Sequence, residues 1–574
     1  QKTAYEMLRS LVGSEMCIRD SSQNVTINFK PNLPISGLNR FMDLSGSYNV
    51  VYNWNDPLQQ DVAIRDVSKQ ASYNTNFRFN VGLQLKELAN SWFGLTPAGV
   101  VTKSKPQDST SIDATGILGE ILSIFKTIFL DYDKITIDLN QTNNSINPGV
   151  FGQTGLANFW TKGIIGQSSV QSYGPSFAYQ LGLIGSPHGD IDLVSSKKFP
   201  YFGFDVNDGL RPPNAILPEN FNQKTTLKMT TSRPLWRGAT IDLSWNTDFA
   251  FNRTQNVETD ANGIPKYTNV MAMESYNRTY LSLPSIFGWD LFDDGIDKVI
   301  ELYDQRKAII FPNGIDSTTV ISPDTSQLLL RALTESFHDG LEAFSLFGGQ
   351  AGKFLPAVNW GIRWEGIEQW DLWGGVIKKA SIEHRYTSKY TENTLITDNG
   401  RNTQNQKVQI GFQPLIGLTM SFDEKQLDGI LTATIKYSTT TDYQLNSSNR
   451  ATISKGSTQE LQIQAGYVMK GFEWNFLGLS LKNEVEASFM ASYQSNDRAT
   501  YDIINTQSNG KDGRILDGSS KIIIEPRIRY NMSNRVTAAF FVRYEGTFTE
   551  GAAQPGFNST QVGLDIRISI AGGR

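Results

Sequence analysis

Residues 561–570 read QVGLDIRISI, and this stretch decides the fold class. Every second residue is apolar, and the residues between them are polar or small. The apolar set is Val562, Leu564, Ile566, Ile568 and Ile570, and the other set is Gln561, Gly563, Asp565, Arg567 and Ser569. Because successive side chains of a β-strand point to opposite faces, the alternation predicts a strand with one apolar face and one polar face.

The same alternation recurs along most of the chain. The longest further example sets Ile241, Leu243, Trp245, Phe249 and Phe251 against Asp242, Ser244, Asn246, Asp248 and Asn252. Other examples are Phe77–Leu85, Ile135–Leu139, Val408–Phe412, Leu431–Tyr437, Leu461–Tyr467, Val485–Tyr493 and Val536–Tyr544. Roughly fifteen to twenty strands of barrel-like length fit in the chain. The pattern predicts an all-β fold: a large antiparallel transmembrane β-barrel, partial in this sequence, with helical inserts.

Connector lengths in the final third alternate between long and short. The expected long loops are Thr391–Gln404, Asn446–Thr458, Asn496–Ser520 and Thr549–Asn558. The expected short turns are Asp423–Gly429, Lys470–Asn475 and Asn531–Asn534. Short turns on one side and long loops on the other are typical of an up-and-down transmembrane barrel. By this pattern, we expect the last strand to run inward and the carboxy terminus to be periplasmic.

Composition agrees with many strands and turns. The 574 residues include 49 Gly, with 11% aromatic and 19% charged residues. The net charge is -5 and no Lys/Arg-rich run occurs, so no nucleic-acid partner is expected. The mean hydropathy is -0.32 and no stretch reaches about 18 uninterrupted apolar residues, which excludes transmembrane helices but fits a barrel whose lumen-facing residues are polar.

Four regions are expected along the chain. Residues 1–21 include Cys17, the sole cysteine, within AYEMLRSLVGSEMCIRDS, which resembles a translation artefact, and we treat this segment as non-native and the sequence as a gene fragment. Residues 22–285 are expected to form barrel strands with a loop or plug-like region at about 148–218. Residues 286–347 carry helical spacing and predict a helical insert, and residues 348–574 predict the carboxy-terminal barrel strands.

Two helix predictions are more specific. Ile117–Leu130 has helical apolar spacing and predicts a short amphipathic helix or plug element. Within the insert of residues 286–347, Ser322-Pro323 is a start signal for the second helix.

Catalytic and metal-binding motifs do not emerge from the sequence. His188, His338 and His384 form no HExxH pair, and no nucleophile elbow or phosphate-binding loop occurs. Glu383 and His384 are adjacent in a predicted strand, so they point to opposite faces and are not expected to act as an acid–base pair. We therefore predict no enzyme activity, no catalytic or cofactor-binding residues, and no bound metal.

An acidic cluster and a set of tryptophans each have two readings. Asp290, Asp293, Asp294 and Asp297 are either calcium ligands or, as we favour, acidic residues in the first turns of a helix. Six tryptophans are expected near strand ends, either as an aromatic membrane-interface belt or as ordinary core residues. They are Trp236, Trp360, Trp364, Trp370, Trp373 and Trp474.

Five ordered blocks resemble the carboxy-terminal half of the SprA/Sov family of the type IX secretion system. They are Ile135–Gly152, Pro175–Ser186, Leu355–Trp370 (LPAVNWGIRWEGIEQW), Ala380–Thr391 (ASIEHRYTSKYT) and Val408–Phe422 (VQIGFQPLIGLTMSF). The resemblance implies part of a giant outer-membrane channel in a Bacteroidetes-like Gram-negative cell. Such a channel exports folded cargo that carries type IX carboxy-terminal signals. It contacts outer-membrane lipid, works with an accessory partner barrel and a periplasmic plug protein, and supports gliding in some bacteria.

Two other functions are weighed against this one. The same alternation and the loop-rich region at 148–218 also suit a porin or a plugged uptake receptor for a small ligand. A membrane-embedded hydrolase needs a nucleophile, a base and an orienting group on neighbouring strands, and the sequence gives no such set.

Overall fold

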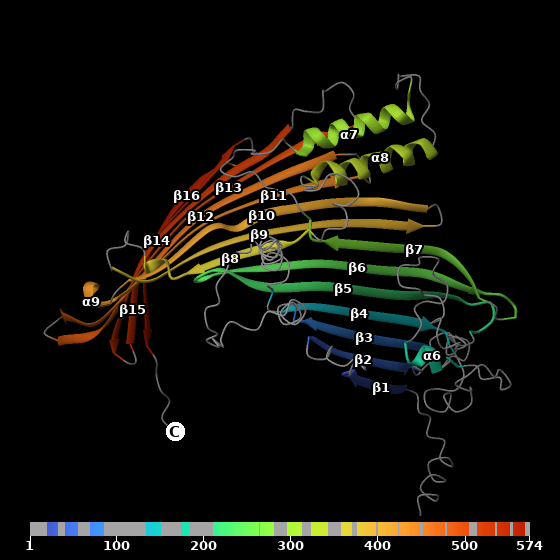
Figure 1. The fold of residues 1–574 in the computed structure, drawn as a ribbon, viewed down its shortest axis with the longest axis horizontal. Coiled ribbons are helices and arrows are strands. Elements are labelled where there is room, and N and C mark those ends of the chain that lie inside the picture. The colour runs from blue at the N-terminus through green and yellow to red at the C-terminus, as the bar shows by residue number, and fades with distance from the viewer. Residues whose placement is uncertain are drawn as a thin grey trace, which may run out of the picture.

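A computed structural model gives the fold (Figure 1). The residues that the structure describes are 20–31, 41–55, 69–84, 132, 134–150, 174–175, 177–182, 211–262, 265–280, 295–312, 323–342, 357–369, 376–397, 400–422, 424–447, 452–476, 479–503, 514–533, 536–550 and 555–568. The expected helix at Ile117–Leu130 and most of the loop region at 148–218 lie outside these residues.

One antiparallel sheet of 16 strands dominates the described chain. The first eight strands are β1 (Asp20–Phe29), β2 (Met42–Asn55), β3 (Gln70–Leu83), β4 (Ile135–Pro148), β5 (Ile216–Trp236), β6 (Ala239–Thr259), β7 (Pro265–Arg278) and β8 (Asn359–Glu365). The others are β9 (Ile377–Thr397), β10 (Gly400–Phe422), β11 (Ile430–Asn446), β12 (Thr452–Phe476), β13 (Leu479–Asp502), β14 (Arg514–Ser533), β15 (Val536–Glu550) and β16 (Phe557–Ile568). The predicted all-β antiparallel fold is thereby confirmed.

Apart from β7 and β8, strands that follow one another in sequence lie side by side, as in an up-and-down barrel wall (Figure 1). We name the two ends of this wall by their connections. The turn end carries Trp236, Phe476 and Ser533, the last residues of β5, β12 and β14. The loop end carries Asn55 and Thr259, the last residues of β2 and β6 at the opposite end.

Strands β7 and β8 share one position between β6 and β9. The loop-end half of β6 pairs with β7, and its turn-end half pairs with β8 through Ala239–Ser244. β9 divides its pairing in the same way, with Tyr390 to Thr397 on β7 and Ser381 to Tyr386 on β8. The wall therefore holds one strand that is interrupted halfway, and the described helices between β7 and β8 in the sequence lie outside the sheet.

Two long helices follow the interruption, as the helical spacing predicts. α7 (Gly295–Ile310) and α8 (Pro323–Leu341) form an antiparallel pair, and α8 begins at the predicted proline (Figure 1). Their apolar sides pack on the loop-end half of the sheet, where a shared core includes Phe337, Tyr390 and Leu445. The other described helical elements are short: α6 (Phe177–Gln180), η3 (Ile367–Gln369) and α9 (Glu424–Leu427).

Several expected loops are strands instead. The prediction of a loop at Thr391–Gln404 is wrong, because β9 continues to Thr397 and β10 begins at Gly400. The loop expected at Asn446–Thr458 is shorter than predicted, because β12 begins at Thr452. These stretches are polar on both faces, so their composition resembles that of a loop. Threonine is nevertheless a good strand former, and polar side chains on neighbouring strands can hydrogen-bond to one another.

Other connector boundaries shift for the same reason. β13 extends to Asp502 and β14 begins at Arg514, so the loop expected at Asn496–Ser520 is shorter. β16 begins at Phe557, inside the loop expected at Thr549–Asn558. The turn expected at Asn531–Asn534 lies later, because β14 continues to Ser533.

The turn-end connections fit the prediction in one case and miss it in another. Asp423–Gly429 does separate β10 from β11 and contains α9. Lys470–Asn475 lies inside β12, so the turn expected there is wrong. Gly471, with a φ of 77°, lies where the register between β12 and β13 shifts, so this glycine serves a bulge rather than a turn.

Two region boundaries also meet described strands. Asp20 and Ser21, in the segment treated as non-native, belong to β1 and pair with Asn55 and Trp54. At the other boundary, β5 already begins at Ile216, within the region expected as a loop at 148–218.

Candidate functional site

The two faces of the sheet differ in chemistry from edge to edge. Register keeps like residues together: Leu564 pairs with Phe540, and Phe540 pairs with Ile528. On the opposite face, Asp565 pairs with Ala539, and Ala539 pairs with Arg529. Because the period of two is preserved across neighbouring strands, the alternation of single strands becomes two continuous surfaces.

An exposed apolar belt covers the turn-end half of one face. Its large exposed side chains include Val25, Ile27, Phe29, Ile416, Ile435, Leu461, Phe489, Tyr493, Ile524, Ile528, Phe540, Val562, Leu564, Ile566 and Ile568. Leu461 is 38% exposed and Leu564 is 66% exposed. Monomeric soluble proteins rarely expose a contiguous apolar patch of this extent, so the belt is a surface that contacts another apolar phase.

The height of the belt matches a bilayer. On β13 the apolar row runs from Val485 to Tyr493, and on β14 its partners run from Tyr530 to Ile522. Eight residue steps span about 27 Å along a strand and somewhat less along the normal of a tilted strand. The outward apolar band of a membrane barrel is about 25 Å tall.

The opposite, polar face carries a ladder of alternating charges. Across β14 and β15, Glu525 contacts Arg527 at 2.8 Å and Arg543 at 3.6 Å. Glu545 contacts the same Arg543 at 3.0 Å and Lys521 at 2.6 Å. Since these side chains are partly exposed, each pair adds little stability, and their main effect is a wettable, charge-balanced surface.

The ladder continues on both sides of these two strands. Arg529 contacts Glu486 of β13 at 3.4 Å, and Arg567 contacts Asp565 of β16 at 3.2 Å. The guanidinium of Arg527 lies 4.9 Å from the ring centre of Phe541, so a cation covers an aromatic side chain on this face. The polar face therefore exposes little apolar surface here.

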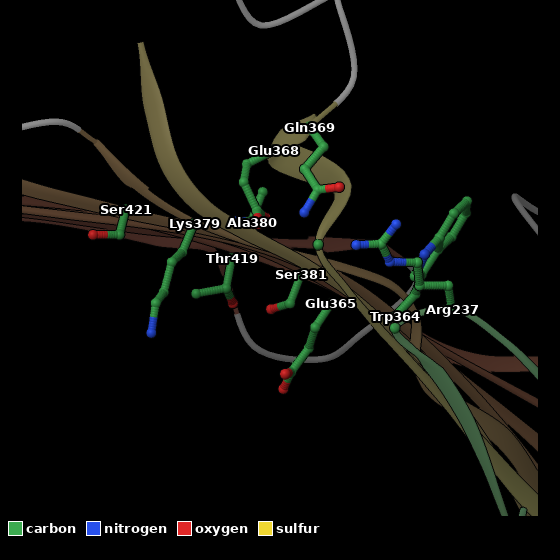
Figure 2. Close-up of a pocket in the computed structure, with 12 residues that line it drawn as sticks. Arg237, Trp364, Glu365, Glu368, Gln369, Lys379, Ala380, Ser381, Thr419 and Ser421 are labelled. Carbon is green, nitrogen blue, oxygen red and sulfur yellow. Dashed lines mark hydrogen bonds between the residues drawn. The ribbon is translucent and has the colours of Figure 1, made fainter. Parts of the chain in front are cut away.

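A cavity of about 680 Å³ opens near the turn end between β8, β9 and β10 (Figure 2). Figure 2 shows Lys379, Ser381 and Thr419 projecting from one side of the strands, with Glu368 and Gln369 of η3 on the other. The Glu368 carboxylate accepts a hydrogen bond from the backbone N–H of Ala380 at 3.1 Å, which ties η3 to β9. The described lining has neither His nor Cys, the usual general base and thiol nucleophile.

A second cavity, of about 530 Å³, lies beside the interruption between β7 and β8. Hydroxyl and amide side chains dominate its lining, and its charged members are Lys134, Lys228, Asp242 and Arg385. Asn359, the first residue of β8, also lines it. Both cavities are suited to water and polar groups.

A cluster of side chains fixes α8 to the point where β7 ends. The guanidinium of Arg278 lies 2.6 Å from Nε2 of His338, and Tyr280 donates a hydrogen bond to the His338 carbonyl. The His338 ring is edge-on to Tyr390, with ring centres 5.1 Å apart. A guanidinium only donates, so Nε2 of His338 is the acceptor in this contact.

A carboxylate completes the cluster and links the two helices. Asp339 accepts from Nδ1 of His338 at 3.0 Å and from Arg306 of α7 at 2.7 Å. Partial burial acts to raise the pKa of Asp339, but these hydrogen bonds and charges outweigh burial and hold the pKa below its ordinary value. We call Arg278, Tyr280, Arg306, His338 and Asp339 the helix latch.

The helix latch and the belt occupy the same face of the sheet. Along β11, Tyr443 and Leu445 lie beneath the helices, whereas Ile435 lies in the belt. All three positions are odd-numbered on one unbroken stretch of β11, so their side chains share a face. The helices thus cover the loop-end half of the face whose turn-end half is the belt.

The histidines and Glu383, which were weighed as site residues and not predicted to form a site, lie in different surroundings. Glu383 lies 3.9 Å from Lys436, whereas Nε2 of His384 accepts a hydrogen bond from Trp360 at 3.2 Å, so the two residues face apart as predicted. His338 belongs to the helix latch. His188 lies outside the described residues.

The acidic cluster is described at one residue. Asp297 is in the first turn of α7, where a helix dipole favours a carboxylate, while Asp290, Asp293 and Asp294 lie outside the described residues. Within the described ranges, no group of three or more His, Cys, Asp or Glu side chains is placed to hold a metal ion.

The tryptophans divide into three groups. Trp236 ends β5 and contacts Trp364 of β8 edge-on, with ring centres 5.3 Å apart. Trp360 stacks on Tyr386 at 4.0 Å and is packed within the wall. Trp474 is close to the end of β12, and Trp370 and Trp373 lie outside the described residues. Trp236 and Trp364 therefore lie at the turn end of the belt, where an interfacial aromatic pair is expected.

The helix latch could not be found by sequence reasoning. Arg278 and His338 are separated by 60 residues, and no motif links them. The available signal was a histidine in the last turn of an amphipathic helix, which by itself does not indicate an arginine partner on another element.

Comparisons with known proteins give no family. No family model and no curated protein matches the chain. Among the described residues, no helix is long and apolar enough to cross a membrane.

Solved structures give distant matches. The ferric yersiniabactin uptake receptor FyuA of Yersinia pestis matches 92% of the chain at 5% identity and a TM-score of 0.23, and the chain spans 60% of that receptor. The ferric-catecholate import receptor Fiu of E. coli K12 matches 94% at 7% identity and a TM-score of 0.24, over 73% of its own length. A loop-deleted OmpT, an outer membrane protein of Vibrio cholerae, matches 62% at 8% identity and a TM-score of 0.15, over 98% of its length.

Proposed function

We propose that this chain forms part of the wall of an outer-membrane β-barrel that conducts folded proteins, the translocon of a type IX secretion system. The observation that carries the proposal is the division of one very large sheet into an apolar belt and a charge-balanced polar face. A membrane barrel needs the first surface for lipid and the second for a water-filled passage.

The belt supports the membrane part of the proposal. Its apolar side chains form a band of bilayer height on strands whose backbone groups pair with their neighbours. The strands also exceed what a bilayer needs. β12 and β13 have 25 and 24 residues, whereas a membrane crossing takes about 9–11. The loop-end halves and the helices on them then project beyond one membrane surface.

The polar face supports the protein-conducting part. A folded cargo moving along a wall must not adhere to it, and paired charges of both signs give a hydrated surface without a strong net field. Glu525, shared between Arg527 and Arg543, is typical of this surface. A porin also has a polar lumen, so the face alone supports a channel in general.

The resemblance of the sequence to the SprA/Sov family supports the specific assignment. It implies outer-membrane lipid, cargo with type IX carboxy-terminal signals, an accessory partner barrel and a periplasmic plug protein as partners. It also implies a Bacteroidetes-like host and a role in gliding where gliding occurs. In this proposal the protein is a channel and not an enzyme, and it uses no cofactor.

The test is depletion of the gene in its host, followed by quantitative proteomics of medium and periplasm. The proposal expects proteins with type IX signals to accumulate in the periplasm and to disappear from the medium. Normal secretion combined with a fall in the uptake of a small solute would instead establish a porin or uptake receptor.

A further inference from the structure

The turn between β5 and β6 is held against the end of β8, at the rim of the cavity of about 680 Å³. The backbone N–H of Glu365 donates a hydrogen bond to the carbonyl of Gly238 at 2.7 Å. Gly238 has a φ of 81°, and a Cβ atom there would clash with the carbonyl oxygen of Glu365. Glycine is therefore required at this contact, which fixes the neighbouring Arg237 beside the cavity that it lines.

The short helix η3 brings two more side chains to the cavity, on the lipid-facing side of the wall. Ile367 of η3 is 0% exposed, in a cluster against which Leu418 of β10 packs. Leu418 is the register partner of Ile435, a residue of the belt, so this cluster lies on the belt face. η3 thereby places Glu368 and Gln369 where the belt face meets the turn end (Figure 2).

Arg233 of β5 projects from the same face. Trp364 packs against the cluster that holds η3, and its register partner on β6 is Ala239. Ile241, two residues along β6 from Ala239, is the register partner of Arg233. Because residues two apart on a strand share a face, the side chain of Arg233 is on the lipid-facing side.

Arg233 and the two tryptophans indicate where the hydrocarbon layer ends. A lipid-facing arginine is costly at the bilayer midplane and nearly neutral close to the bilayer surface. The guanidinium of Arg233 lies 5.8 Å from the ring centre of Tyr132, and Trp236, which is 50% exposed, follows at the end of the same strand. Trp236 contacts Trp364, which lines the cavity. Tryptophan side chains prefer the level of the lipid headgroups, so the cavity lies at that level.

The lining on this side offers groups of both charges. A guanidinium such as that of Arg237 can bind a phosphate through two parallel N–H donors, and the amide of Gln369 can donate to a further phosphate oxygen. The Glu368 carboxylate accepts the N–H of Ala380 at 3.1 Å, and its remaining lone pairs can accept from an ammonium group. A cavity of about 680 Å³ is within the size range of ligand pockets.

We propose that this cavity binds the headgroup of a phospholipid from the leaflet at the turn end, and that this headgroup carries both a phosphate and a primary ammonium group. Arg237 and Gln369 donate to the phosphate, and Glu368 accepts from the ammonium group. The acyl chains lie along the belt beside Trp364. The proposal rests on the membrane location in the proposed function, and it is independent of protein conduction.

Native mass spectrometry of the complete protein in detergent tests this site. Three lipids with the same acyl chains are titrated: phosphatidylethanolamine, phosphatidylglycerol, which lacks the ammonium group, and diacylglycerol, which also lacks the phosphate. Retained lipid is expected to decrease in that order. Equal retention of the three would show that only acyl chains are held, and it would overturn the proposal.

Arg237→Gln is expected to weaken the retention of both phospholipids about tenfold, because a charge-assisted contact with the phosphate is lost. Arg363→Gln is the matched control. Arg363 directly precedes Trp364 on β8 and so projects from the polar face, where it contacts Glu365 at 3.2 Å. This control should retain lipid like the unchanged protein, and equal losses in the two variants would overturn the proposal.

Glu368→Gln tests the ammonium half of the site. Glutamine can still accept the N–H of Ala380, so η3 stays tied to β9, while the negative charge is removed. The preference for phosphatidylethanolamine over phosphatidylglycerol should disappear, and an unchanged preference would contradict the assignment. An excess of soluble glycerophosphoethanolamine should leave the lipid bound, whereas displacement would identify a site for a solute instead.

Reconstitution into vesicles of the same phospholipids separates this proposal from the proposed function. A chain that inserts into the vesicles and retains phospholipid with no headgroup preference would overturn the headgroup site alone. A chain that fails to insert would overturn the membrane location as well.

Discussion

The side chain of Asn359 bonds to the backbone of Ser388 as a neighbouring strand would. Its Oδ1 accepts from the N–H of Ser388 at 2.8 Å, and its Nδ2 donates to the carbonyl of Ser388 at 3.3 Å. Ser388 lies between the stretch of β9 that pairs with β7 and the stretch that pairs with β8. Asn359 thus satisfies the backbone at the interruption, and the hydroxyl of Ser388 accepts the N–H of Tyr280 at 3.1 Å.

Asn359→Ala is expected to open this junction. Ser388 is 5% exposed, so its backbone groups would lose their partners where water does not replace them readily, at a cost of about 1–3 kcal/mol. Hydrogen exchange should show faster exchange at Ser388 and in β8. Asn402→Ala, at an exposed position of β10, is the control. Equal exchange at Ser388 and in β8 in the two variants would contradict the role of Asn359.

Leu564→Arg is expected to disrupt membrane insertion, whereas Gln561→Arg is not. Leu564 lies on the belt and Gln561 on the polar face of the same strand, so the two variants add the same charge to opposite faces. An arginine facing lipid near the midplane costs about 2–4 kcal/mol. Unfolding by denaturant in lipid vesicles measures the difference, and comparable losses for the two variants would argue against a lipid-facing belt.

Leu333→Ala is expected to loosen α7 and α8 from the sheet. Leu333 is 1% exposed within the shared core, and truncation of such a leucine costs about 2–5 kcal/mol. Limited proteolysis of the helices should become faster while the strands stay protected. Leu328→Ala, at a position on the same helix that is 52% exposed, should leave the rate nearly unchanged.

The helix latch is expected to weaken in acid. The folded-state pKa of Asp339 is lowered, so its contribution is complete above the ordinary pKa of 3.8 and is lost as pH falls through the folded-state value. Hydrogen exchange in α8, measured between pH 7 and pH values below 3.8, should show this loss. In the Asp339→Asn variant, hydrogen exchange in α8 should be faster at neutral pH than in the unchanged protein. It should also change less when the pH is lowered. The same acid response in Asp339→Asn would assign the effect to another group.

Much of the wall could be predicted from local pattern. Val536–Tyr544 and the stretch ending in Ile568 follow a period of two, with Ala539 and Phe541 as apolar exceptions on the polar face, because one face contacts an apolar phase and the other contacts water. Both stretches form strands as predicted. The two helices after residue 286 could also be predicted from local pattern, because a helix that covers a sheet has one apolar side.

Prediction failed where the environment was alike on both faces. Beyond the belt, β9 and β10 continue with residues such as Thr394 and Thr403, whose hydroxyls lie 3.4 Å apart. Because neither face contacts an apolar phase there, the sequence does not alternate between apolar and polar residues. A paired strand that is polar on both faces then has the composition of a loop.

The amino-acid sequence by itself determined the class of structure: many antiparallel strands with one apolar side, two amphipathic helices, and no motif for catalysis. Periodicity is a local property, so it can be read without knowing which strands meet. The tertiary structure decided that β7 and β8 share one position, that Asn359 closes the gap at Ser388, and that Arg278 meets His338. These features depend on register and on contacts between residues far apart in the chain, which no local pattern encodes.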